Sequence, residues 1–283
     1  MRRTETVAVY SEDAEPPRAR PQTIGLRQWL DEIVAYSELL TNLVARDLKT
    51  KYRGSFFGIF WSLLNPLLLM LVYTLVFSLI VRVNIHPYPV FLLAGLVPWN
   101  AFAQSLIQAT TSVTDSRGIV SKVAFPRQVL PLSAVLSGSV NFLISLGLLA
   151  ILTVVLHPHL GWSILLLPLL VLLQVTFTFG LGAILAAAQV YFRDVQYFVG
   201  VFLTAWFFLT PVVYSIDFVP PRLRPILLLN PMAWDISSFQ AIWFYGRIPS
   251  VGYLVLFAAV AGLSLLLGII VFGRLSRRFA EEV

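Results

Sequence analysis

Residues 128–192 read QVLPLSAVLSGSVNFLISLGLLAILTVVLHPHLGWSILLLPLLVLLQVTFTFGLGAILAAAQVYF, and they contain no Asp, Glu, Lys or Arg. An α-helix rises about 1.5 Å per residue, so about 20 apolar residues cross the hydrocarbon core of a bilayer. This stretch is therefore long enough to cross a membrane twice, with an interfacial turn at 157–159. Water does not tolerate so much apolar surface, whereas lipid covers it. The chain is predicted to be a membrane protein.

The composition agrees with a protein that crosses the bilayer several times. Hydrophobic residues make up 58% of the chain and its mean hydropathy is +0.82, both above the range of soluble domains. The uncharged runs predict an all-α, polytopic membrane protein with six transmembrane helices. We place these spans at about 56–81, 88–112, 129–156, 162–190, 195–214 and 250–273.

Lys and Arg residues are divided unequally between the two sides of the membrane that these spans define. Sixteen of the 20 lie on the side that receives both termini, and only Arg82, Arg222, Arg224 and Arg247 lie on the other. Positively charged loops remain in the cytoplasm, so both termini are predicted to be cytoplasmic. The net charge of +6 is then explained by topology and contact with anionic membrane lipid, and no nucleic acid partner is expected.

The ends of the chain differ in character from the spans. Residues 1–22 have no apolar core, so they are no signal peptide and are predicted to form a disordered cytoplasmic tail. Residues 23–55 are predicted to form an amphipathic helix in the inner headgroup plane, followed by a basic elbow. A surface helix that packs on another protein would show the same periodicity. The transmembrane domain is expected over 56–278, and 279–283 form a cytoplasmic C-terminus.

The segment 215–249 is hydrophobic but is interrupted by five prolines and several charged residues. Neither half is long enough to span, so we predict a re-entrant hairpin of two short helices in the outer leaflet. Irregular backbone at membrane depth must be buried in protein or face a water-filled cavity. The hairpin is therefore a candidate external gate, with candidate residues Asp217, Arg222, Arg224, Trp234 and Trp243.

Two of the predicted spans carry polar side chains at four-residue spacing, which places them on one helix face. Such polar stripes either hold helices together within a bundle or line an aqueous or sugar-filled path. Both interpretations remain open. The stripes comprise Asn100, Gln104 and Gln108 in the second span, and Ser133, Ser137, Asn141 and Ser145 in the third.

The sequence lacks the motifs of the common hydrolases and nucleotide-binding proteins. There is no GxxxxGK[ST], HExxH or GxSxG motif, and the absence of cysteine excludes disulfides and thiol chemistry. No charged residue lies in the middle of a predicted span, where proton- or sodium-coupled carriers usually keep one. We therefore expect no enzymatic activity and no metal site in this chain, and cargo movement driven by another subunit.

Several motifs resemble, in order, those of the ABC-2 type permeases, the membrane halves of polysaccharide, O-antigen and teichoic-acid exporters. The resemblance extends over 25–278, and the ordered set is specific. The motifs are RDLKTKYRGS at 46–55, WSLLNP at 61–66, LAGLVPW at 93–99, KVAFPR at 122–127, YFRDV at 191–195 and LLNPM at 228–232.

The resemblance implies a homodimer of this chain bound to two copies of a cytoplasmic ATPase. That partner would bind ATP and magnesium, so no cofactor is expected in this chain. The 115–127 loop resembles a coupling helix that docks on the ATPase, although an ordinary positive-inside loop would also be basic. The candidate coupling residues are Arg46, Lys122, Phe125, Pro126, Arg127, Arg193 and Asp194.

The resemblance also implies a substrate, an undecaprenyl-linked glycan exported across the bacterial inner membrane. Aromatic rings stack on the apolar faces of sugars and provide contact without fixed charge. Lipid-facing or core aromatics would have the same spacing. The candidate path residues are Tyr73, Phe77, Asn100, Gln104, Phe198, Phe202 and Trp206.

Three other functions are alternatives to polysaccharide export. A drug or small-lipid exporter permease shares the six-span layout, but the motifs at 46–66 favour glycan. A membrane-embedded glycosyltransferase would need clustered acidic residues at one membrane edge, whereas Asp115, Asp194 and Asp217 are divided between the two sides. A scaffold or assembly role stays open on sequence alone.

Overall fold

The computed structural model describes residues 26–82, 85–120, 125–156, 161–276 and Phe279. Every regular element within these ranges is helical, which confirms the predicted all-α fold. The predicted tail at 1–22, the coupling candidate Lys122 and the last four residues lie outside the described residues.

Five helical segments are long and apolar enough to cross a membrane, and they match five of the six predicted spans. Each consists of 21 to 30 residues, which exceeds the length that a bilayer core requires. The first segment, Gly58–Ser78, comprises η1 (Gly58–Phe60), α3 (Trp61–Thr74) and the first part of η2 (Leu75–Ile80). The others are α4 (Tyr88–Asp115), α6 (Val129–Leu156), η3 (Trp162–Leu166) with α7 (Leu167–Tyr191), and α11 (Val251–Leu275).

The remaining predicted span, 195–214, is a shorter apolar helix. Helix α8 (Val195–Phe208) has 14 residues, which correspond to about 21 Å of helix. Pro211 follows closely, and a proline at that place cannot donate the hydrogen bond that would continue the helix. The chain therefore leaves the helical path within the bundle at 209–213 instead of completing a sixth full-length span.

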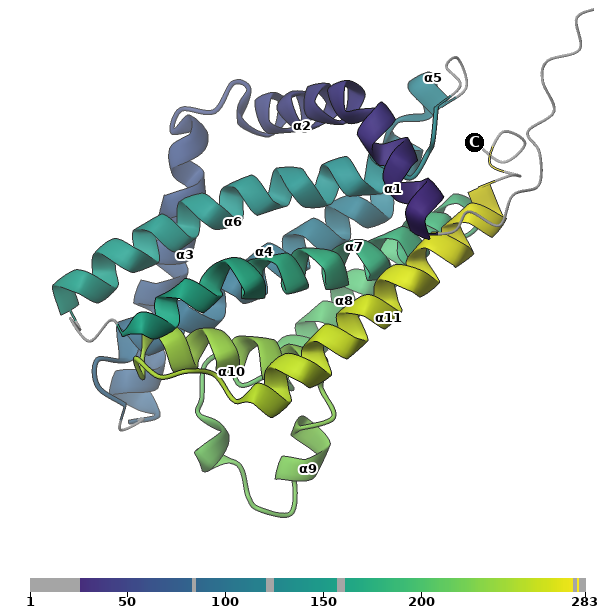
Figure 1. Ribbon diagram of the computed structural model, residues 1–283. Coiled ribbons are helices and arrows are strands. Elements are labelled where there is room, and N and C mark those ends of the chain that lie inside the picture. The colour runs from purple at the N-terminus through teal and green to yellow at the C-terminus, as the bar shows by residue number, and fades with distance from the viewer. Residues whose placement is uncertain (1–25, 83–84, 121–124, 157–160, 277–278, 280–283) are drawn as a thin grey trace, which may run out of the picture.

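Helix α4 lies at the centre of the bundle (Figure 1). It contacts α3, α6, α7, α8 and α10 (Pro231–Trp243), while α11 packs on α7 and α10. In its most apolar window 72% of α4 is buried, compared with 6% for the segment that contains α3. Helix α3 therefore lies at the margin of the bundle, and Pro66 is its only buried residue.

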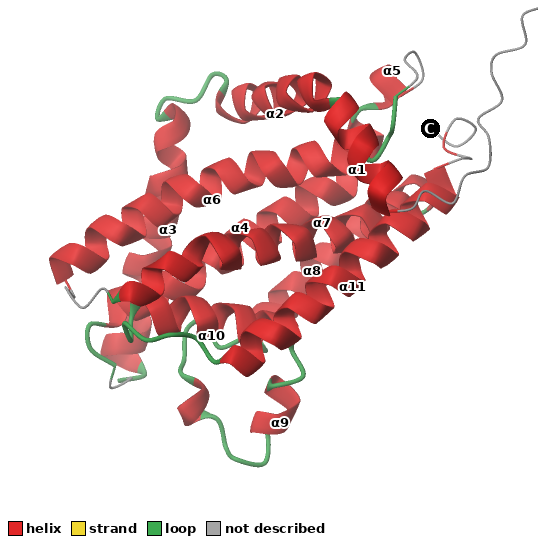
Figure 2. Ribbon diagram, viewed as in Figure 1, coloured by secondary structure: helices red, strands yellow, loops and turns green. Residues whose placement is uncertain are grey.

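The loops divide between two ends of the bundle, called here the α5 end and the α9 end (Figures 1 and 2). The α5 end carries α1 (Leu26–Ala35), α2 (Ser37–Tyr52), α5 (Arg117–Val120) and the last turn of α11. The α9 end carries η4 (Ile216–Phe218) and α9 (Arg224–Leu227). Helix α4 runs from the α9 end to the α5 end.

The predicted amphipathic helix consists of two helices, α1 and α2. Tyr36 leaves the helical backbone region between them, although Leu40 N–H still donates to Tyr36 O at 2.9 Å. Trp29 of α1 is buried and stacks on Phe179 of α7, with 5.5 Å between ring centroids. One side of α1 therefore packs on the bundle, while Val34 and other apolar residues remain exposed for lipid or a partner.

Helices α7 and α11 approach closely because glycines face each other. A Cβ atom on Gly180 would lie 2.3 Å from the backbone carbon of Ser264, and a Cβ on Gly268 would lie 2.5 Å from Gly180 O. Small residues permit such backbone contact and compensate for the weak hydrophobic drive between helices in lipid. The contact anchors the last span to the bundle.

The predicted hairpin contains one buried helix, α10, and an exposed loop with the single-turn helices η4 and α9. The short helices of the predicted hairpin therefore differ in length, since α10 has 13 residues and α9 has four. Asn230 caps α10 by accepting a hydrogen bond from Met232 N–H at 3.0 Å, and Pro231 occupies the first turn, where no donor is required. The three closely spaced prolines at 220–225 prevent a second long helix in the loop.

Candidate functional site

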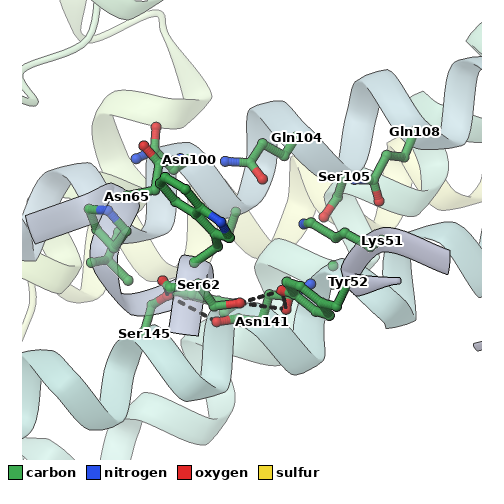
Figure 3. Close-up of a pocket in the computed structure, with 16 residues that line it drawn as sticks. Lys51, Tyr52, Ser62, Asn65, Asn100, Gln104, Ser105, Gln108, Asn141 and Ser145 are labelled. Carbon is green, nitrogen blue, oxygen red and sulfur yellow. Dashed lines mark hydrogen bonds between the residues drawn. The ribbon is translucent and has the colours of Figure 1, made fainter. Parts of the chain in front are cut away.

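A polar pocket lies between α2, α3, α4 and α6 (Figure 3). Its volume is about 370 Å³, and most of the polar side chains around it are neutral amides or hydroxyls. The labelled residues in Figure 3 are Lys51, Tyr52, Ser62, Asn65, Asn100, Gln104, Ser105, Gln108, Asn141 and Ser145.

The polar stripe of α6 holds helices together. The Tyr52 hydroxyl at the end of α2 forms hydrogen bonds with Ser62 Oγ of α3 and Asn141 Oδ1 of α6. Ser62 Oγ also donates to Asn141 Oδ1 at 3.0 Å, and Ser145 Oγ donates to Ser62 O at 3.1 Å. This network fastens α3 to α6 just after the elbow, where Gly54 has a positive φ of 73° that a side chain would strain.

The polar stripe of α4 faces the pocket instead. The side-chain amides of Asn100, Gln104 and Gln108 form no hydrogen bond with another described residue, and neither does the side-chain amide of Asn65 of α3. Each amide offers two N–H donors and one carbonyl acceptor. Four amides are therefore free to bind the hydroxyl or phosphoryl oxygens of a ligand. The stripe of α4 fits the interpretation that polar residues line a path, whereas the stripe of α6 fits the interpretation that they hold helices together.

A second pocket of about 390 Å³ continues toward the α5 end. Lys51 and Gln108 line both pockets, which we call together the polar groove. The second pocket is richer in hydroxyl groups and contains three charged residues of α2, Arg46, Asp47 and Lys51. Its lining includes Arg46, Asp47, Thr50, Thr111, Ser112, Asp115, Ser133 and Ser137.

Charges in the polar groove are only partly compensated. Arg46 Nη2 and Asp47 Oδ1 form an ion pair at 2.9 Å. Lys51 forms no ion pair with any carboxylate in the described ranges, and its ammonium lies 5.9 Å from the Tyr52 ring centroid. Although its side chain remains exposed along the groove, nearby protein displaces water and lowers the pKa of Lys51 below its ordinary value.

The structure separates the predicted path residues into groups. Asn100 and Gln104 line the polar groove. Tyr73 and Trp206 lie on the opposite side of α4 in an aromatic cluster: Tyr73 stacks on Phe207 at 6.0 Å, and Trp206 meets Trp99 at 6.3 Å.

The other three aromatic residues of the predicted path lie outside that cluster's centre. Phe77 stacks on Tyr88 at 6.2 Å, so it contributes to the packing of η2 on α4. Phe198 and Phe202 are 73% and 56% exposed on α8, where they are available to lipid or to another subunit. The aromatic candidates therefore do not line the groove that contains the two amides.

The predicted coupling residues also differ in their surroundings. Arg127 Nη1 donates to Ser276 O at 2.5 Å, and its guanidinium lies 5.9 Å from the Phe279 ring centroid. Phe125 packs against the apolar core, and Pro126 O accepts a hydrogen bond from the first residue of α6, Val129, at 3.0 Å. These three residues therefore join the loop to the bundle.

The turn between α7 and α8 is the more accessible coupling candidate. Arg193 and Asp194 are exposed at the α5 end. Gln189 holds the turn in place, because its amide nitrogen donates to Arg193 O at 3.0 Å and its amide oxygen accepts from Gln196 N–H at 2.9 Å. Arg46, by contrast, lines the polar groove and is paired with Asp47.

The predicted gate residues fall into two environments. Asp217 and Arg222 are exposed, and Arg224 donates to Asp217 O and Val219 O at 2.9 Å each, which shapes the loop. Trp234 and Trp243 are buried within the bundle and belong to the packing of α10. The charged gate candidates therefore belong to the loop at the α9 end that contains η4 and α9, where an external gate is predicted.

Sequence reasoning missed the side chains that support the irregular backbone at 209–213. Gln240 Nε2 donates to Pro211 O at 2.9 Å, and Tyr88 Oη donates to Val213 O at 2.8 Å. It also missed Tyr52, Ser62 and Asn65 as part of the pocket. The available signal was the presence of polar groups in otherwise apolar helices. The described residues contain no cluster of His, Asp and Glu that could hold a metal.

Comparison with known proteins points to one family. The ABC-2 type transporter family model matches residues 38–244. An O-antigen export system permease protein RfbA of Myxococcus xanthus is 41% identical over 254 residues, which cover 89% of this chain and 98% of that protein. A protein of the same name from Klebsiella pneumoniae is 33% identical over 86% of this chain and 94% of its own length. A polysialic acid transport protein KpsM of Escherichia coli is 21% identical over 77% of this chain and 87% of its own length.

Proposed function

Because this chain belongs to the ABC-2 type transporter family, we propose that it is the membrane-spanning permease of an ATP-driven exporter of lipid-linked polysaccharide. The observation that carries the proposal is the 41% identity to an O-antigen export permease over 98% of that protein's length. The distant similarity to a polysialic acid transport protein supports the same class of cargo.

The polar groove supports a saccharide cargo. Its free amides can exchange hydrogen bonds with sugar hydroxyls, as water does, and so bind a polar ligand without strong fixed charge. An exporter of apolar drugs would gain little from a pocket whose lining is largely amides and hydroxyls. The groove therefore favours polysaccharide over an apolar drug.

The proposed assembly contains two copies of this chain and two copies of a cytoplasmic ATPase, which binds ATP and magnesium. The α5 end would face the cytoplasm of a bacterial cell, because positively charged segments remain on that side of the inner membrane. Arg193 and Asp194 would contact the ATPase, since both are exposed at the α5 end. This chain supplies the passage and the partner supplies the energy.

A deletion strain tests the proposal directly. Loss of the chain should abolish glycan at the cell surface and cause lipid-linked glycan to accumulate inside, and complementation should reverse both effects. The same result should follow from inactivating the ATPase. Unchanged surface glycan, together with increased sensitivity to small apolar drugs, would instead support the drug-exporter alternative.

A paired substitution tests the groove. Replacing Asn100 and Gln104 with Leu removes two amides, each with a hydrogen bond of about 1 kcal/mol, and should slow export by about thirtyfold. Ile107→Leu is the matched control, because Ile107 is exposed on the same helix and does not line the groove. Equal export rates in both variants, at equal protein levels, would remove the groove from the transport route.

A further inference from the structure

Three different environments follow one another along helix α4. Pro89 at its start lines an apolar hollow of about 380 Å³, Asn100 and Gln104 line the amide-rich pocket, and Asp115 at its end lines the hydroxyl-rich pocket. An α-helix rises about 1.5 Å per residue, so these environments extend over about 39 Å. Their order from the α9 end is apolar, amide-rich and hydroxyl-rich.

Helix α3 connects the first two environments. Pro66 lines the amide-rich pocket, while Met70, Thr74 and Ser78 line the apolar hollow. These four residues follow at four-residue steps, so they lie along one face of the helical segment. An elongated ligand could therefore pass from the amide-rich pocket into the apolar hollow without leaving the surface between α3 and α4.

Lys51 supplies a positive charge at the junction of the amide-rich and hydroxyl-rich pockets. No carboxylate in the described part of the chain forms an ion pair with it, so its ammonium is available to an anionic ligand, although Asp47 and Asp115 line the neighbouring hydroxyl-rich pocket. The amide N–H groups of Asn65 and Gln104 lie in the same pocket and can donate to the remaining oxygens of such an anion. Among the described residues that line the amide-rich pocket, Lys51 is the only charged one, so a phosphoryl group there would meet one cation and neutral donors.

We propose that the polar groove of one subunit binds the headgroup of a lipid-linked saccharide, with a phosphoryl group at Lys51. The sugar then lies in the hydroxyl-rich pocket and the hydrocarbon chain lies in the apolar hollow. This assignment rests on the proposed function and deepens it. It places the headgroup within one subunit, between α2, α3, α4 and α6, so binding does not require residues of a second copy.

The chain is suited to a direct test because it contains only three lysines, Lys49, Lys51 and Lys122. Lys49 is exposed on α2 and lines neither pocket, so it is an internal control in the same molecule. A bound phosphate favours the charged ammonium form and raises the pKa of Lys51, whereas amine reagents attack only the neutral form. Ligand binding should therefore protect Lys51 and leave Lys49 reactive.

The experiment uses the full-length chain in phosphatidylcholine nanodiscs and follows lysine modification by mass spectrometry. Undecaprenyl diphosphate at about ten times its Kd should slow modification of Lys51 by about tenfold, by mass action. Undecaprenol, which lacks the phosphate, should give no protection. Lys51→Gln should weaken retention of undecaprenyl diphosphate by about 10- to 100-fold, while Lys51→Arg retains it and Lys49→Gln leaves it unchanged.

Three outcomes would overturn the inference. Equal protection by phosphatidylglycerol would show a general site for anionic lipid, and equal protection of Lys49 would show a non-specific effect. The absence of protection by undecaprenyl diphosphate would remove the headgroup from the groove. If the intact chain still exports glycan in cells, any of these results refutes the headgroup site alone, whereas surface glycan in a deletion strain refutes the proposed function.

Discussion

The indole N–H of Trp206 donates to Oδ1 of Asn230 at 2.8 Å and ties α8 to the residue that begins α10. Asn230 Nδ2 in turn donates to Leu209 O at 3.1 Å and to Thr210 Oγ1 at 2.9 Å. With Gln240 and Tyr88, it satisfies the carbonyls of a non-helical segment inside the bundle. Such backbone is tolerated in a membrane protein only when protein groups replace its missing hydrogen bonds.

Trp206→Phe should destabilise the junction between α8 and α10, because it keeps an aromatic ring but removes the donor to Asn230. We expect a loss of about 1 kcal/mol in the free energy of unfolding. Thermal unfolding of the purified chain in detergent measures it. Val201→Leu is the control, since Val201 is 73% exposed on the same helix. A midpoint equal to that of the control would show that the hydrogen bond contributes nothing.

Gly180→Ala should force α7 and α11 apart, because the new methyl group would lie 2.3 Å from the backbone of Ser264. Overpacking of this kind costs about 1–3 kcal/mol, so a lower unfolding midpoint and less protein in the membrane are expected. Gly262→Ala is the matched control on α11, where a Cβ atom meets nothing within 4 Å. Similar behaviour of the two variants would contradict the close packing.

Tyr52→Phe should loosen α2, because it removes the hydroxyl that binds Ser62 and Asn141. A loss of about 1 kcal/mol corresponds to about fivefold faster hydrogen exchange if α2 opens locally. Exchange over Ser37–Tyr52, followed by mass spectrometry, provides the measurement. Tyr197→Phe, at an exposed position of α8, should leave that exchange unchanged. If exchange over α2 in Tyr52→Phe stayed as slow as in the unaltered chain, the Tyr52 hydroxyl would not be what holds α2 in place.

Substitutions at the α5 end should separate packing from docking. Arg127→Gln removes the hydrogen bond to Ser276 O and should lower the unfolding midpoint, because the last turn of α11 loses a partner for its carbonyls. Arg193→Gln changes an exposed side chain, so it should weaken co-purification of the ATPase while the midpoint stays the same. If Arg127→Gln weakened co-purification of the ATPase and Arg193→Gln lowered the unfolding midpoint, the loop before α6 would be the docking element instead.

Single cysteines test the orientation without interference, since the chain contains none of its own. Arg222→Cys lies in the exposed loop at the α9 end and should react with an impermeant maleimide in intact spheroplasts. Arg193→Cys at the α5 end should react only after lysis. Labelling of the second position from outside would reverse the proposed topology.

The sequence alone determined the all-α membrane fold, because an uncharged run of about 20 residues has no stable alternative to a helix in lipid. It also indicated the family, through motifs that recur in order from Arg46 to Met232. It placed Asn100 and Gln104 on one helix face but left open whether that face binds another helix or a ligand.

The tertiary structure decided the direction in which each side chain points. It joined Asn141 to Tyr52 across 89 positions of sequence, left the amides of α4 facing a pocket, and turned Trp206 toward Asn230. It also ended α8 early and supplied Gln240 to the carbonyl of Pro211. Periodicity identifies the face that a residue occupies, but the partner of that face depends on how distant helices pack, and helix packing is not encoded in any single stretch of sequence.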